Sequence, residues 1–266
     1  MGRKTIRVNL PISEPDETNT LCDSILAKHT ALGPASPLTG LFDMVDFAAI
    51  LTFCKDNRKN AAKKDGESQA KYGEAAVLCG IAKGQNKQTT GTLYVFVLAI
   101  RDYLLIKFRD NPETLSQWGF AVVVSQTGGH RNVRVEIPND SPETLLALCN
   151  TINDKHVLDG PASVLLSGTV DMLVFGTKLG SANTVLGESV TLRQAKEALN
   201  QQVEAKQGYA EGQTSETVGT LYYSYTGIRD RLLNVNQGVE ENLSEWGFDV
   251  VLGEARGAAP DEEPIP

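Results

Sequence analysis

The stretch LSQWGFAVV at residues 115–123 recurs as LSEWGFDVV at residues 243–251, which is 128 residues later. These two stretches contain both tryptophans of the 266-residue chain. Self-similarity at a long period is typical of a structural unit that occurs more than once. The repeated stretch therefore predicts that the chain is a tandem duplication of one module.

The match continues on both sides of the two stretches. Up to the phrase GPAS, found at 33–36 and 160–163, the two copies are 127 residues apart. Beyond it they are 128 apart, as two further phrases show: GTLY at 91–94 and 219–222, and IRD at 100–102 and 228–230. Matched order over this length predicts that both copies share one fold. The predicted domains are copy 1 at 1–126, a hairpin linker at 127–133, copy 2 at 134–252 and an acidic disordered tail at 253–266.

Each copy is predicted to be mainly helical. In copy 2 the first helix starts at Ser141 as the N-cap residue, with Pro142 at the first helical position, and ends before GPAS. A long helical stretch follows at 41–83 and 169–211, and the pattern leaves open whether it is one helix or a helical hairpin. A last helix is predicted at 90–109 and 218–235, with an apolar stripe at helical spacing.

Short strands are predicted at the junctions of the modules. FAVVV (120–124) and VRVEIP (133–138) are β-rich or alternating stretches, and the phrase TGGH lies between them. This order predicts an antiparallel hairpin. By equivalence, residues 5–11 should pair antiparallel with 248–252, either within the chain or with the next molecule. The fold class is thus mainly α, a duplicated helical-bundle module with short antiparallel strands at the module junctions.

Both tryptophans are predicted to be structural. Trp118 and Trp246 should cover the end of a helical bundle, and the glycine that follows each should turn the chain into a strand. The four cysteines are interpreted as small buried hydrophobic residues in a reducing compartment, because a disulfide framework would be expected in both copies. These are Cys22, Cys54, Cys79 and Cys149.

Charge differs between the two copies. Residues 1–133 hold 16 Lys and Arg and 13 Asp and Glu, a net charge of +3. Residues 134–266 hold 9 and 20, a net charge of −11. Opposite charge favours contact between unlike copies, which suggests head-to-tail assembly of separate molecules.

Several classes of site are disfavoured. The longest apolar run, LYVFVLAI at 93–100, is too short to span a bilayer and no secretory signal is visible, so the cytoplasm is the default location, with the cell surface as the alternative. The loop GQNKQTTGT at 84–92 lacks a phosphate-binding motif and is predicted to connect two helices through a threonine cap. A basic cluster in copy 1 is interpreted as a solvated helix face rather than a nucleic-acid site, because the net charge is −8 and aromatic residues are not interleaved. Its members are Lys55, Arg58, Lys59, Lys63 and Lys64.

No catalytic, cofactor or metal residue is predicted. His29 and His156 are expected to contact free carbonyls at helix ends rather than a metal, which would need further ligands. His130 is expected to be solvated. The pairs Arg101-Asp102 and Arg229-Asp230 are expected to contact polar groups on neighbouring helices.

Four phrases of copy 1 carry a resemblance to a known family. KHTALGPASPL, GQNKQTTGTLY, RDYLL and LSQWGFAVV resemble an uncharacterised family of bacterial helical proteins. The resemblance covers nearly the whole chain, with Val164 standing where the pattern has proline at Pro37. It implies no activity and adds no site.

The sequence therefore favours a non-enzymatic structural or self-assembling protein, with a head-to-tail filament as one form. Its expected partner is itself or another protein, without nucleic acid and without a membrane span. The alternative is a binding module for an unknown protein, and a small-molecule carrier or an enzyme is favoured less.

Overall fold

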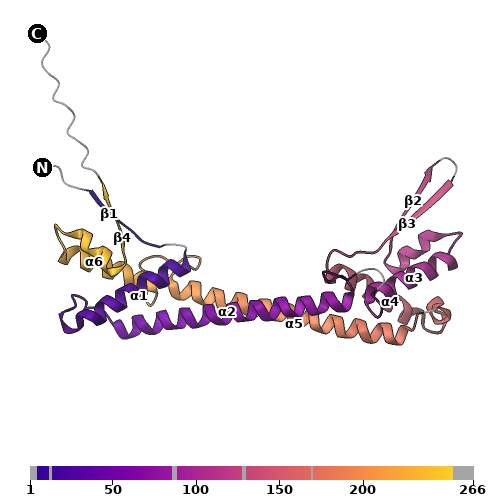
Figure 1. Cartoon of the computed structure of the whole chain (residues 1–266), viewed down its shortest axis with the longest axis horizontal. Coiled ribbons are helices and arrows are strands. Elements are labelled where there is room, and N and C mark those ends of the chain that lie inside the picture. The colour runs from indigo at the N-terminus through magenta and orange to yellow at the C-terminus, as the bar shows by residue number, and fades with distance from the viewer. Residues whose placement is uncertain (1–4, 12–13, 86–88, 128–129, 169, 254–266) are drawn as a thin grey trace, which may run out of the picture. The chain divides into compact units, whose positions relative to one another are not determined.

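The structure is a computed structural model that describes residues 5–11, 14–85, 89–127, 130–168 and 170–253 (Figure 1). It is mainly helical, and its strands form two antiparallel two-stranded sheets. The elements of the first half are β1 (Thr5–Asn9), α1 (Pro15–Leu32), η1 (Gly33–Ala35), α2 (Met44–Cys79), α3 (Leu93–Lys107), η2 (Pro112–Trp118) and β2 (Ala121–Thr127). Those of the second half are β3 (His130–Glu136), α4 (Pro142–Asp159), η3 (Gly160–Ala162), η4 (Val164–Ser167), α5 (Met172–Gln207), α6 (Leu221–Val235), η5 (Glu240–Trp246) and β4 (Asp249–Gly253). The α-helices thus form three pairs of equal length, with 18, 36 and 15 residues.

The long stretch of each copy is one continuous helix. Neither α2 nor α5 contains a proline, and each is 36 residues long, which corresponds to about 54 Å. An aspartate caps each start: Asp43 Oδ1 accepts from two backbone N–H groups of α2, and Asp171 Oδ1 does the same for α5. The hairpin alternative is therefore wrong for the described chain.

The chain divides into two compact units, and the boundaries between them fall within the long helices α2 and α5. Unit 1 consists of residues 1–62 and 196–266, and unit 2 consists of residues 63–195. Each unit therefore contains the first part of one sequence copy and the last part of the other, which differs from the ranges 1–126 and 134–252 predicted as domains. The continuous helix gives the physical reason. It separates the first and last elements of a copy, which a helical hairpin would have brought together.

Unit 1 has a core built from α1, the first part of α2, the last part of α5, and α6. Its buried apolar side chains come from both copies. The elements η5 and β4 also contribute apolar side chains to this core. They include Leu21, Cys22, Ile25, Leu38, Phe47, Leu51, Cys54, Val203, Leu221, Tyr225, Ile228, Leu232, Leu243, Trp246 and Phe248.

Unit 2 has its own core, between α3, α4, the last part of α2 and the first part of α5. Its members again come from both copies and form one cluster. They include Cys79, Leu93, Val97, Ile100, Leu104, Leu115, Trp118, Phe120, Leu145, Leu146, Cys149, Ile152, Leu165, Phe175 and Leu179.

Both predicted strand pairings are confirmed. In unit 2, β2 and β3 form an antiparallel hairpin in which Ala121 faces Glu136 and Thr127 faces His130. In unit 1, β1 and β4 are antiparallel within the same chain, with Asn9 opposite Asp249, and the Asn9 Nδ2 donates to the Asp249 Oδ2 at 2.8 Å. The strands near the chain ends therefore find partners without a second molecule.

The W-G-F phrase shows why tryptophan and glycine are adjacent. Trp118 and Trp246 are 2% and 4% exposed, so the prediction that they are buried is confirmed. Gly119 and Gly247 end the 3-10 helices η2 and η5 with φ of 85° and 88°, a left-handed conformation that glycine adopts without strain. After each glycine the chain continues as a strand, as the sequence predicted.

All four cysteines are buried and free. Burial raises the pKa of the Cys54 thiol to about 11 and that of Cys79 to about 12, and it raises the pKa of Cys22 and Cys149 as well. The thiolate is the reactive species, so we expect the native protein to react with a thiol reagent such as Ellman's reagent at a rate limited by opening. In denaturant four thiols should react at once. Fast reaction of any thiol in the native protein would contradict this burial.

Candidate functional site

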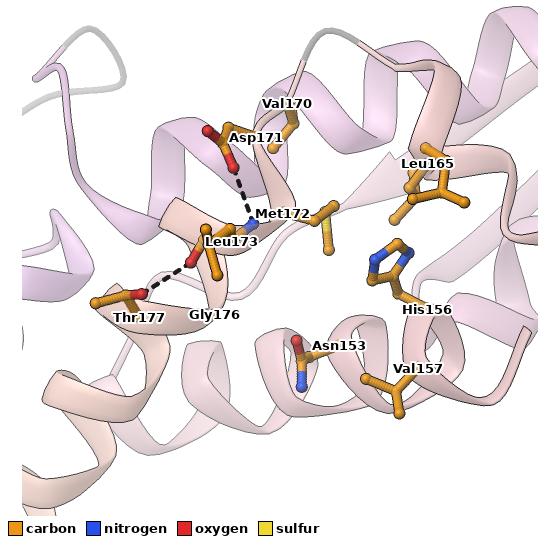
Figure 2. A pocket seen from close by; sticks show the side chains of 11 residues that line it. Asn153, His156, Val157, Leu165, Val170, Asp171, Met172, Leu173, Gly176 and Thr177 are labelled. Atoms are coloured by element: carbon orange, nitrogen blue, oxygen red, sulfur yellow. Dashed lines mark hydrogen bonds between the residues drawn. The ribbon is translucent and has the colours of Figure 1, made fainter. Parts of the chain in front are cut away.

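The apolar hollow of unit 2 is the candidate site. It lies where the end of α4 and the turn η4 meet the start of α5, and it has a volume of about 760 Å³ (Figure 2). Apolar side chains line most of it, with a few polar groups at its edges. The lining residues are Asn153, His156, Val157, Leu165, Leu166, Val170, Asp171, Met172, Leu173, Gly176 and Thr177.

Three of its polar groups, on His156, Asp171 and Thr177, have structural partners. The His156 Nδ1 forms a hydrogen bond of 2.6 Å with the Ser163 Oγ, which also accepts from the Leu165 N–H. Asp171 caps α5, and the Thr177 hydroxyl donates to the Leu173 carbonyl oxygen, as Figure 2 shows. These bonds hold the turns after α4 and the first turn of α5 in place.

The histidine–serine pair occurs in both units. In unit 1 the His29 Nδ1 lies 2.7 Å from the Ser36 Oγ. The histidines therefore contact a serine seven residues later, and the expectation that they contact free carbonyls through their side chains is wrong. Ser36 and Ser163 are 5% and 4% exposed, so neither is open to a substrate as a nucleophile. The pair fastens the GPAS turn to the end of the preceding helix.

Large apolar side chains around the hollow point into solvent. Leu173 is 80% exposed, and Val157 and Leu166, which also line the hollow, are 68% and 61% exposed. Single exposed leucines are ordinary on a protein surface, but a group around a hollow marks an interaction surface. Periodicity in the sequence does not reveal this group, because helical spacing marks the buried stripe of each helix and these residues lie off it. Apolar residues off that stripe, such as Val157 and Leu173, were the available signal.

A second hollow lies in unit 1, between the start of α2 and α6, with a volume of about 650 Å³. Its apolar residues include the exposed Leu41 and Val218, but carboxylates also line it: Asp43, Asp46, Glu216 and Asp230. The Arg229 guanidinium in its wall pairs with the adjacent Asp230 at 2.7 Å. This hollow is therefore the more acidic of the two.

Charge is distributed differently between units than between copies. Unit 2 holds 13 Lys and Arg and 13 Asp and Glu, so it is neutral, whereas unit 1 holds 12 and 20, a net charge of −8. Ion pairs join the copies within each unit: Lys28 to Glu245 at 2.6 Å and Lys71 to Glu188 at 2.9 Å. The opposite charges of the copies thus meet inside one chain.

The other residues considered in the sequence have local partners. Arg101 pairs with the adjacent Asp102 at 2.7 Å, and Arg229 pairs with Asp230 in the same way, so the expected contacts with neighbouring helices are not what these pairs form. In the basic cluster, Lys55 pairs with Asp23, Arg58 with Asp16, and Lys63 and Lys64 with Glu67. The cluster is thus a helix face with acidic partners in its own surroundings, as an ordinary solvated face would be.

The glycine-containing loop is described in part, since 86–88 lie outside the described residues. Thr92 is the N-cap residue of α3, but its hydroxyl donates to the Thr89 carbonyl oxygen rather than accepting from the helix. Its counterpart Thr220 does cap α6, accepting from the Tyr223 N–H. The threonine cap predicted for the loop at 84–92 is therefore wrong at α3, although the counterpart loop has such a cap at α6. The side chain of His130 is not among the described parts.

Across the ranges that the structure describes, no three side chains of His, Cys, Asp or Glu gather closely enough to hold a metal ion. Within the same ranges, no helix combines the length and apolar character that crossing a bilayer requires.

Comparison with known proteins found no matching family model, no matching curated protein and no matching solved structure.

Proposed function

We propose that the protein is a non-enzymatic structural protein, built by duplication of one helical module, that self-associates through the apolar hollow of unit 2. The equal lengths of its paired helices and the repeated phrases of its sequence support the duplication. The observation that carries self-association is the group of exposed apolar side chains that line the hollow, above all Leu173, Val157 and Leu166. A second molecule of the protein would cover these side chains and remove them from water, which stabilises a complex in proportion to the apolar area buried.

The charge of the two units favours unit 2 as the contact. Two molecules that meet through unit 2, which is neutral, bury apolar area without net electrostatic repulsion between these units. Two molecules that meet through unit 1 bring together two units that each have a net charge of −8. A contact between two unit 2 surfaces is isologous and closes as a dimer. A head-to-tail filament would need unit 1 as a second, different surface.

Strand exchange is not needed for this assembly. The pairing of β1 with β4 inside one chain satisfies the strand edges on which an end-to-end filament would have been built. The proposed contact therefore uses side chains rather than backbone hydrogen bonds. It should persist as ionic strength rises, because screening weakens charge contacts and leaves apolar burial in place.

The test is sedimentation equilibrium of the full chain over a wide concentration range. Leu173→Glu should raise the dissociation constant of the dimer at least about 10-fold, because it places a charge in an apolar contact. Val45→Glu is the matched control, since Val45 occupies the equivalent position in unit 1 and is 82% exposed. It should leave the dimer unchanged.

Wild-type protein that stays monomeric at the highest concentration would overturn self-association, and so would equal effects of the two variants. Weakening by Val45→Glu alone would move the contact to unit 1. If wild-type protein forms species larger than a dimer, and each variant lowers their mass, the assembly is open and uses both surfaces.

A further inference from the structure

Unit 1 contains a buried polar network that crosses the two copies. The Gln207 Nε2 donates to the carbonyl oxygen of Pro15 at 3.0 Å and to the Asn19 Oδ1 at 3.1 Å. The hydroxyl of Thr18 is hydrogen-bonded to that of Tyr209. Gln207 and Thr18 are fully buried, and Asn19 is nearly so. Each of these bonds has one partner on α1, from copy 1, and the other on or just after α5, from copy 2.

Two tyrosines extend the network to the chain after β1. The hydroxyls of Tyr209 and Tyr225 each lie 2.7 Å from the carbonyl oxygen of Pro11, and they lie 3.1 Å from one another. Tyr225 is fully buried. The Pro11 carbonyl oxygen of copy 1 thus accepts hydrogen bonds from two hydroxyl groups of copy 2.

Unit 2 has apolar side chains at all five equivalent positions. The repeat aligns Thr18 and Asn19 with Leu145 and Leu146 of α4, both buried. It aligns the other three residues with members of copy 1: Gln207 with Cys79, Tyr209 with Ile81, and Tyr225 with Val97. These residues belong to the apolar core of unit 2 or pack against it.

The two sets are matched in polarity and in size. In unit 1, Asn19 and Thr18 on α1 contact the long amide of Gln207 and the large side chain of Tyr209, and Tyr225 lies beside Tyr209. In unit 2, larger leucines on α4 share a core with the smaller Cys79 and Val97. Matching of this kind is expected where a core must fill its volume and satisfy its polar groups at the same time.

We propose that these matched sets determine which half of the chain pairs with which, so that copy 1 pairs with copy 2 and not with another copy 1. Like-with-like pairing would place Thr18 and Asn19 against Cys79, Ile81 and Val97, with no donor or acceptor for the buried amide. It would also place Leu145 and Leu146 against Gln207 and the two tyrosines. The side chains would then be too large for the space, and the buried polar groups would lack hydrogen-bond partners. Specificity then comes from unpaired polar groups in the wrong complex, as in other systems that discriminate between related partners. The partner surface for either copy, in one chain or between chains, is the other copy. This inference is independent of the contact proposed at the apolar hollow.

The direct test is a double-mutant cycle in the full chain, with thermal unfolding as the readout. Asn19→Leu and Gln207→Met are close in shape to the native residues, so the variants should fold. Asn19→Leu removes an acceptor from the buried Gln207 amide and should lower the melting temperature by roughly 2–10 °C. Adding Gln207→Met should recover part of that loss, because no buried donor is left unpaired. It also removes the Gln207 Oε1, which is buried and has no hydrogen-bond partner among the described residues.

The reciprocal cycle in unit 2 is the matched control. Leu146→Asn should lower the melting temperature, and adding Cys79→Gln should restore part of it by rebuilding the polar pair of unit 1 at the equivalent positions. Coupling of this sign in both cycles supports the proposal. Additive losses in both cycles would overturn it, because the sets would then act independently of their partners. Coupling in unit 1 alone would mean that Asn19 and Gln207 form only a local hydrogen bond. That result would also overturn the proposal, because the matched residues would not determine pairing in unit 2.

Discussion

Replacing Trp118 or Trp246 with alanine is expected to lower the free energy of unfolding by about 3–5 kcal/mol, the usual cost of truncating a buried aromatic side chain. Each indole lies in the core of its unit at 2% or 4% exposure. The indole of Trp118, from copy 1, also lies 5.7 Å from the Nζ of Lys155, from copy 2, so it helps to join the copies. Denaturant unfolding followed by circular dichroism gives the measurement.

Phenylalanine at the same positions separates burial from indole chemistry. Trp118→Phe keeps most of the apolar volume and should cost clearly less than Trp118→Ala. If both alanine variants cost under about 1 kcal/mol, the tryptophans do not support the cores and their burial has no energetic consequence.

Alanine at Gly119 or Gly247 should be the second large effect, at roughly 2–5 kcal/mol, because strain and overpacking add. Both glycines have positive φ, which an alanine adopts at a cost. A Cβ at Gly119 would lie 2.8 Å from Thr151 Cγ2 on α4, and one at Gly247 would lie 2.6 Å from Ser24 Cβ on α1. The helix of one copy thus presses against the glycine turn of the other.

Gly238 is a control for the backbone term alone. Its φ is +89°, close to that of Gly247, but a Cβ there would meet no heavy atom within 4 Å. Gly238→Ala should therefore cost about 1–2 kcal/mol, as expected for strain without a clash. Equal costs for Gly238→Ala and Gly247→Ala would show that α1 does not approach the turn as closely as the structure has it.

Local structure could largely be predicted from the sequence, because its causes are local. Ser141 and Pro142 mark the start of α4, and the Ser141 side chain does accept from the Thr144 N–H. Alternation and a glycine turn predicted the β2–β3 hairpin, and the repeat carried the same pairing to β1 and β4. The burial of both tryptophans followed from their place in the repeated phrase.

The exchange of halves could not be predicted in the same way. It depends on whether α2 continues through its polar middle, and residues such as Lys63, Lys64 and Gly66 fit either a solvated helix or a turn. Ion pairs along one face support the helix there, including Lys64 with Glu67 and Lys71 with Glu188. Lys64 and Glu67 are only three residues apart in the sequence, whereas the pairing of Lys71 with Glu188 becomes visible only in three dimensions. The charge difference between copies was the available signal, but it was interpreted as a contact between molecules.

The hollow of unit 2 was missed for a related reason. Its walls come from α4 and α5, which are separated by the GPAS turn, and the angle between them is set by packing rather than by periodicity. The exposed Leu173 is an ordinary helix former, so its helix propensity does not distinguish it from a buried leucine.

The central claim, that each unit joins the first part of one copy to the last part of the other, is tested by zero-length carbodiimide cross-linking of the monomeric fraction. Glu245 can be linked to either of two equivalent lysines, Lys28 of copy 1 or Lys155 of copy 2. Mass spectrometry should find Glu245 joined to Lys28, whose Nζ lies 2.6 Å from its carboxylate. A Glu245–Lys155 link in its place would mean that copy 2 folds on itself, and it would contradict the account.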